Sequence, residues 1–211
     1  MHNDLKERAK KLENNYNYNG KEFLSIVNKI KKDKINDGEL LTQIENLSRK
    51  RFEGKVSLTL GLFTGNLLEI IATIAAIVLA FRINTDWVLY LCVLILMATL
   101  HPLSHYLTGS LFGIRFTHYY LNGPARIEPT LRINYFSYLK AKGVKRALMH
   151  ASGVIGTLAA PLIVALIALD KGALGVAMNL MYFFLLLIVF ELLTSTKIGD
   201  LMKAKREYGY R

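Results

Sequence analysis

Two histidines stand four residues apart in the segment Leu100–Gly113, LHPLSHYLTGSLFG, which ends a long apolar run. On a helix, side chains at this spacing project from one face about one turn apart. His101 and His105 would then present two neutral imidazoles to one ion, a usual way for a helix to supply two zinc ligands. The simpler interpretation is a pair of interfacial histidines hydrogen-bonded to backbone or water.

The composition limits the chemistry that is open to these histidines. The single cysteine, Cys92, lies inside an apolar run, so a disulfide framework or a thiolate metal cluster is not possible. Any metal site must therefore use histidine and carboxylate ligands. The chain is 52% hydrophobic and yet has 27 Lys and Arg residues, which avoid the apolar runs. This pattern indicates a membrane protein in contact with anionic lipid head groups, and it does not predict a nucleic-acid partner.

Four apolar runs must position the histidines, near residues 56–81, 87–107, 147–169 and 173–195. Each is long enough to cross a hydrocarbon core of about 30 Å as a helix. The strongly basic segments are the N-terminal 55 residues, the 108–146 link and the C-terminal tail, and a four-span topology puts all three on one side. The positive-inside rule then predicts an integral, multi-pass protein whose N- and C-termini are cytoplasmic.

This topology brings chemically useful residues to one end of the molecule. His101 and His105 fall toward the cytoplasmic end of the second span, and His150 falls at the start of the third. Asp200 follows the fourth span, which itself contains Glu191. An ionisable residue within a span is a functional candidate, so the clustering favours a site over scattered interfacial histidines.

We predict an all-α polytopic membrane protein in two parts. Residues 1–55 are expected to form a cytoplasmic extension of short amphipathic helices, and residues 56–211 a four-span membrane domain with the metal site. Within the long link, Arg126–Tyr135 alternates apolar and polar residues after an Asn-Gly-Pro turn, which predicts a short extended or hairpin segment. Pro129 limits that segment to a sheet edge or a break.

Several short motifs follow one another in a recognisable order. They are His101-Pro-Leu-Ser-His105, Leu111-Phe112-Gly113, Gly123-Pro124, the small-residue stretch Ala147–Pro161 and the Gly199-Asp200 pair. This order resembles the site-2 protease family of intramembrane zinc metalloproteases. The resemblance covers residues 101–165 well and 190–203 poorly, and it does not include residues 1–55. It implies a zinc cofactor bound by His101, His105 and Asp200, and a membrane-associated peptide as the substrate.

The chain departs from that family at the catalytic base. The family has His-Glu-x-x-His, whereas Pro102 stands here in place of the glutamate. Proline has no proton acceptor and disfavours helical geometry at the preceding residue, so we expect the helix to restart at Pro102 with His101 near its cap. Asp200 also follows a glycine instead of preceding one. His150 is therefore an alternative third ligand, and Glu191 is the best remaining candidate for the base.

Two functional hypotheses follow. One is a metal-dependent hydrolase of site-2 protease type that cleaves membrane peptides. The other is a catalytically inactive relative of such enzymes with a binding or regulatory role, as the loss of the base suggests. A haem held by His101 and His150, and a Ser152 nucleophile, are weaker alternatives. Four core histidines are too few for a desaturase-like di-iron site. The sequence leaves the oligomeric state open.

Overall fold

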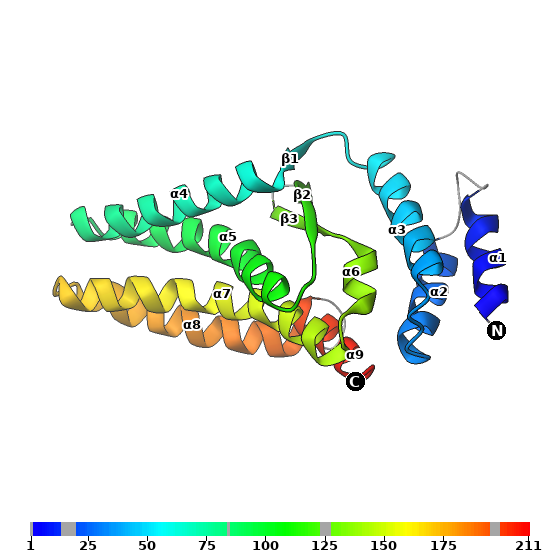
Figure 1. Ribbon diagram of the computed structural model, residues 1–211. Coiled ribbons are helices and arrows are strands. Elements are labelled where there is room, and N and C mark those ends of the chain that lie inside the picture. The colour runs from blue at the N-terminus through cyan, green and yellow to red at the C-terminus, as the bar shows by residue number, and fades with distance from the viewer. Residues whose placement is uncertain (1, 14–19, 84, 123–127, 195–198) are drawn as a thin grey trace.

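Long helices account for most of the computed structural model, which describes residues 2–13, 20–83, 85–122, 128–194 and 199–211 (Figure 1). Four of these helices are long and apolar enough to cross a membrane. Their bounds are α4 Leu62–Arg82, α5 Asp86–Leu111, α7 Gly143–Asp170 and α8 Leu174–Thr194. Large apolar side chains are exposed along α4 and α8, as expected of surfaces that face lipid. The four helices agree with the four apolar runs of the sequence.

The two central helices of this bundle, α5 and α7, approach each other closely because α7 carries glycine at the contact. A Cβ atom on Gly156 would lie 2.5 Å from the carbonyl oxygen of Leu100 on α5. Small residues permit such close approach of two helices. Beyond this contact, Leu96 of α5 and Val164 of α7 are fully buried in an apolar cluster that includes residues of α4 and α8.

A three-stranded antiparallel sheet adjoins the ends of α4 and α5 (Figure 1). Its strands, in spatial order, are β1 Thr59–Gly61, β2 Phe116–Asn122 and β3 Glu128–Ile133. The β2–β3 pair lies in the long link where an extended or hairpin segment is predicted, and Pro129 lies on the edge strand β3. The Gly-Pro part of the predicted turn lies outside the described residues. β1 was not predicted, because its apolar residues run directly into the first span.

The N-terminal helices are α1 His2–Glu13, α2 Gly20–Lys32 and α3 Gly38–Glu53. Asp37 caps α3 by accepting hydrogen bonds from the backbone N–H groups of Glu39 and Leu40. The apolar faces of α2 and α3 are buried in a cluster that also contains Phe116 of β2 and Met149 of α7. The N-terminal helices therefore share a core with one end of the bundle of four long helices.

Two short helices complete this end of the molecule: α6 Tyr135–Lys140 and α9 Asp200–Tyr208. Gly199 precedes α9 with φ of 94°, a conformation that L side chains rarely adopt, so glycine is required at this entry. α9 packs against α7 and returns the C-terminal segment to the end of the bundle that carries the sheet (Figure 1).

Candidate metal centre

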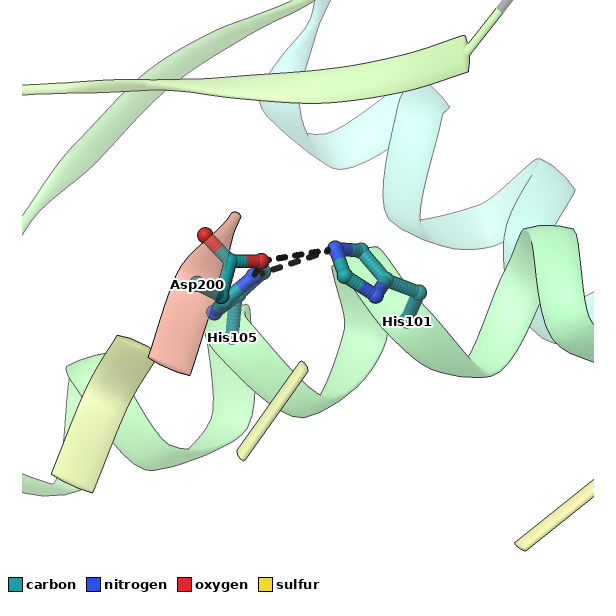
Figure 2. A group of neighbouring side chains, drawn as sticks. All are labelled: His101, His105 and Asp200. Atoms are coloured by element: carbon teal, nitrogen blue, oxygen red, sulfur yellow. Dashed lines mark hydrogen bonds and ion pairs between the residues drawn. The ribbon is translucent and has the colours of Figure 1, made fainter. Parts of the chain in front are cut away.

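Two helices that are far apart in the sequence supply one compact group of ligand atoms. His101 and His105 lie one turn apart on α5, and Asp200 is the first residue of α9 (Figure 2). The Nε2 atoms of the two histidines are 3.2 Å apart. Oδ2 of Asp200 lies 3.0 Å from Nε2 of His105 and 3.2 Å from Nε2 of His101. We call these residues the three-ligand site. Among the described residues, their ligand atoms are close enough together to hold one metal ion.

The size of this triangle fits a tetrahedral zinc ion. With Zn–N and Zn–O bonds near 2.0–2.1 Å, two ligand atoms of a tetrahedral site are about 3.3 Å apart. The observed edges of 3.0–3.2 Å are close to that value. Three protein ligands would leave a fourth position open, which is the arrangement of catalytic zinc sites and not of structural ones.

The outer nitrogen of each imidazole is held by a hydrogen-bond acceptor on α7. Nδ1 of His105 lies 2.6 Å from the carbonyl oxygen of Met149, which can only accept, so Nδ1 carries the proton. Nδ1 of His101 lies 2.9 Å from the hydroxyl oxygen of Thr157, whose own proton goes to the carbonyl of Gly153. In the neutral form of each ring the lone pair is then on Nε2. Metal-bound histidines are usually oriented by partners of this kind.

A cation is needed where these three atoms meet, because two imidazole lone pairs and a carboxylate oxygen repel one another. Either protons or a metal ion can meet that need. Burial acts to raise the pKa of Asp200, but hydrogen bonds from His101 and His105 outweigh it and hold that pKa well below its usual range. The second carboxylate oxygen of Asp200 is paired with Nζ of Lys203 at 2.8 Å, so only Oδ2 faces the two imidazoles.

Gly153 provides the space that the imidazoles occupy. A Cβ atom there would lie 2.5 Å from Cε1 of His105 and 2.9 Å from Cε1 of His101. Neighbouring Ser152, the weaker nucleophile candidate, instead donates to the carbonyl oxygens of Ser104 and Met149. In this geometry its hydroxyl serves helix packing.

His150 lies beside the three-ligand site and not within it. Its Nδ1 is 3.9 Å from Oδ1 of Asp200, and its Nε2 is 2.9 Å from the hydroxyl of Tyr138. The geometry therefore favours Asp200 over His150 as the third ligand. His118, the histidine of the link, is exposed on β2 and borders a different cavity.

The expected helix break at Pro102 is wrong. α5 runs without interruption from Asp86 to Leu111, with Pro102 buried in its interior. Pro102 cannot donate to the carbonyl of Ala98, but a helix tolerates this loss where neighbouring helices pack around it. His101 is thus an interior helical residue, and its helical alignment with His105 is preserved.

A cavity of about 160 Å³ opens beside the three-ligand site. Pro102 and Leu131 contribute apolar walls, and the carboxylate residue Glu128, at the start of β3, also lines it. Glu128 was missed as a candidate, although it is the single acidic residue between positions 108 and 146. Glu191 on α8 interacts electrostatically with His101 and Asp200, but it is not among the described residues that line this cavity.

Comparisons of the chain with models of protein families, with curated proteins and with solved structures find no match. The resemblance to site-2 proteases therefore depends on the sequence motifs alone.

Proposed function

We propose that this protein is a membrane-embedded, metal-dependent hydrolase that binds zinc at His101, His105 and Asp200 and cleaves membrane-associated peptides. One observation carries the proposal: both Nε2 atoms and one carboxylate oxygen turn toward a common point, while the opposite nitrogen of each imidazole is held by an acceptor on α7. Histidine and carboxylate ligands in a small tetrahedral arrangement suit zinc better than magnesium or calcium, which prefer oxygen ligands.

The residues around the site have separate roles in this proposal. When bound, zinc supplies Lewis-acid chemistry, since it acidifies water and polarises a carbonyl group. Lys203 neutralises the outer oxygen of Asp200, and the acceptors on α7 orient the two imidazoles. Pro102 and Leu131 give the cavity apolar walls beside the ligands.

Pro102 stands at the position where site-2 proteases have their glutamate base. In this proposal another carboxylate must therefore accept the proton. Glu191 is one candidate, since it interacts electrostatically with His101 and Asp200. Glu128 is the other, because it lines the cavity with the ligands. A general base has to come within about 3 Å of the water that it activates, directly or through one further water.

A catalytically inactive, metal-binding protein is the second candidate. Pro102 favours it, because this residue is next to His101, lines the cavity and offers no proton acceptor. The protein would then keep the three-ligand site for binding or regulation of a membrane partner.

The distribution of basic residues supports a cytoplasmic location for both termini and for the sheet, with the site near the inner leaflet. Four apolar helices are compatible with an integral membrane protein. The partners in this proposal are membrane lipids and a transmembrane peptide.

Metal analysis of the full chain purified in detergent tests the proposal. We expect about one zinc per chain, and a loss of that zinc in the His101→Ala/His105→Ala double variant. His118→Ala is the matched control, since His118 is exposed on β2, and it should retain the metal. Equal zinc in the wild-type protein and in the double variant would contradict the metal site.

Cleavage of fluorogenic transmembrane peptides separates the two candidates. For a hydrolase, Glu191→Gln or Glu128→Gln should lower turnover about 100-fold or more, and the variant that does so identifies the base. A protein that holds zinc in the three-ligand site but cleaves no peptide would be the inactive relative.

A further inference from the structure

A second group of charged residues is buried at the far end of α9. The side chain of Glu207 is fully buried. Its Oε1 lies 2.5 Å from Nζ of Lys31 on α2, and its Oε2 lies 2.7 Å from Nε of Arg146 on α7. Lys31, Arg146 and Glu207 form what we call the buried ion cluster. It joins the N-terminal helices, a membrane-spanning helix and the C-terminal helix at one point.

The buried ion cluster and the three-ligand site are two ends of the same short helix. Asp200 and Glu207 are seven residues apart on α9, which is about two turns or about 10 Å, so both lie on one face. Ala204 is buried between them. At the C-terminal end the fit is tight, because a Cβ atom on Gly143 of α7 would lie 2.6 Å from the carbonyl oxygens of Glu207 and Tyr210. A shift of Glu207 would therefore move Asp200.

The charges of this cluster are not balanced. Arg206 also approaches Glu207, at 3.5 Å, so three cations share one carboxylate. Burial lowers the pKa of Lys31 to about 8 despite the attraction of Glu207. A buried ion pair of this kind is weak evidence for stability, but it can define the relative position of the elements that it joins.

We propose that Lys31 and Glu207 are positioning residues that hold Asp200 against His101 and His105, so that the N-terminal helices set the affinity of the three-ligand site for zinc. This inference rests on the proposed metal site. It gives the N-terminal helices a role that their sequence alone does not suggest: when α2 is docked, α9 is fixed and the third ligand is in place.

Tyr138 provides a second connection between Lys31 and the surroundings of Asp200. Nζ of Lys31 lies 5.0 Å from the centre of the Tyr138 ring, and the hydroxyl of Tyr138 lies 2.9 Å from Nε2 of His150. His150 in turn faces the outer oxygen of Asp200 at 3.9 Å. Lys31 thus contacts Glu207 on the helix that carries Asp200. It also contacts Tyr138, whose hydroxyl is hydrogen-bonded to His150 beside Asp200.

The test compares cobalt and zinc binding by full-length variants in detergent. Lys31→Met removes the charge and keeps most of the length of the side chain, and Lys31→Arg keeps the charge. Lys32→Met is the matched control, since Lys32 is the exposed neighbour on the same helix. We expect Lys31→Met to weaken metal binding about tenfold, at the lower end of the range for groups that orient metal ligands. Its cobalt absorption spectrum should also depart from the tetrahedral form.

Rescue distinguishes positioning from a general loss of folding. Lys31→Arg should recover most of the affinity and the wild-type spectrum, and Lys32→Met should change neither. Should Lys31→Met fail to fold, Lys31→Gln keeps a hydrogen-bond donor to Glu207 and should show a smaller loss in the same direction. If the wild-type protein binds metal and Lys31→Met binds it equally well with the same spectrum, the positioning role is wrong and the metal site stands. If the wild-type protein binds no metal, the proposed function fails and this inference fails with it.

Discussion

At the scale of single residues, the direction of each imidazole is the feature that matters most. An isolated His-x-x-x-His pair on a helix has two nitrogens per ring and no fixed tautomer. Here the carbonyl of Met149 and the hydroxyl of Thr157 hold the Nδ1 atoms, and Nε2 of each ring is left to face Asp200. The absence of a side chain at Gly153 is as important as these bonds, since it allows both rings to lie between α5 and α7.

Gly153→Ala is expected to weaken zinc binding about 100-fold, because its Cβ would overlap the ring of His105 and push both imidazoles off their common point. Titration of the detergent-purified variant with zinc measures the loss. Gly175→Ala on α8 is the control, since a Cβ there meets nothing within 4 Å. Wild-type affinity in Gly153→Ala would show that the described ring positions are not those that bind metal.

At the scale of elements, α9 is held at both ends. Its first residue belongs to the three-ligand site, and Glu207 in its last turn belongs to the buried ion cluster. Burial acts to raise the pKa of Glu207, but the charges of Lys31 and Arg146 and their hydrogen bonds outweigh it and lower that pKa. Lys31 and Arg146 therefore favour the ionised form of the Glu207 carboxylate in the folded protein.

The docking of α9 should therefore weaken in acid. A carboxyl group whose pKa is lower in the folded protein stabilises it fully above its unfolded pKa of about 4.5, and loses that effect as the pH falls through the folded value. We expect amide hydrogen exchange in α9 to accelerate as the pH is lowered from 6 to below about 4, after correction for intrinsic rates. In the Glu207→Gln variant, amide exchange in α9 should be fast both at pH 6 and below about pH 4. The exposed control Glu53→Gln should behave as wild type, and a flat profile in the wild-type protein would contradict the assignment.

At the scale of the whole molecule, the three-ligand site lies where two apolar clusters meet. One cluster fills the bundle of α4, α5, α7 and α8, and the other joins the N-terminal helices to the sheet and to the start of α7. A metal ion at this junction would link α5, which belongs to the bundle, to α9, which contacts the N-terminal helices through Glu207.

Zinc should therefore stabilise the whole protein and not only the site. A ligand at 100 times its Kd stabilises the folded state by about 2.7 kcal/mol when it binds the folded state alone. We expect zinc to raise the midpoint of thermal unfolding of the full chain in detergent, and a chelator to reverse the shift. Magnesium should give no shift, because two imidazole ligands do not suit it. A zinc shift of equal size in the His101→Ala/His105→Ala variant would indicate binding elsewhere.

The sequence by itself determined the features that depend on local periodicity. Four apolar runs predicted the four long helices, and the amphipathic pattern of residues 1–55 predicted short N-terminal helices. Alternating residues in Arg126–Tyr135 predicted the extended segment that contains β3. The spacing of His101 and His105 predicted that both side chains project from one face of a helix. Each of these features is set by neighbours within a few turns or one strand, so the pattern of side chains is sufficient.

Only the tertiary structure decided which distant residues meet. Asp200 contacts His105 across 95 positions, and Glu207 contacts Lys31 across 176 positions. Packing also decided against a helix break at Pro102, added β1 to the sheet and brought Glu128 to the cavity. Such contacts depend on how whole helices and strands pack. A chain's local pattern does not specify that packing, because the same helices could dock in more than one way until glycine contacts and buried charges select a single arrangement.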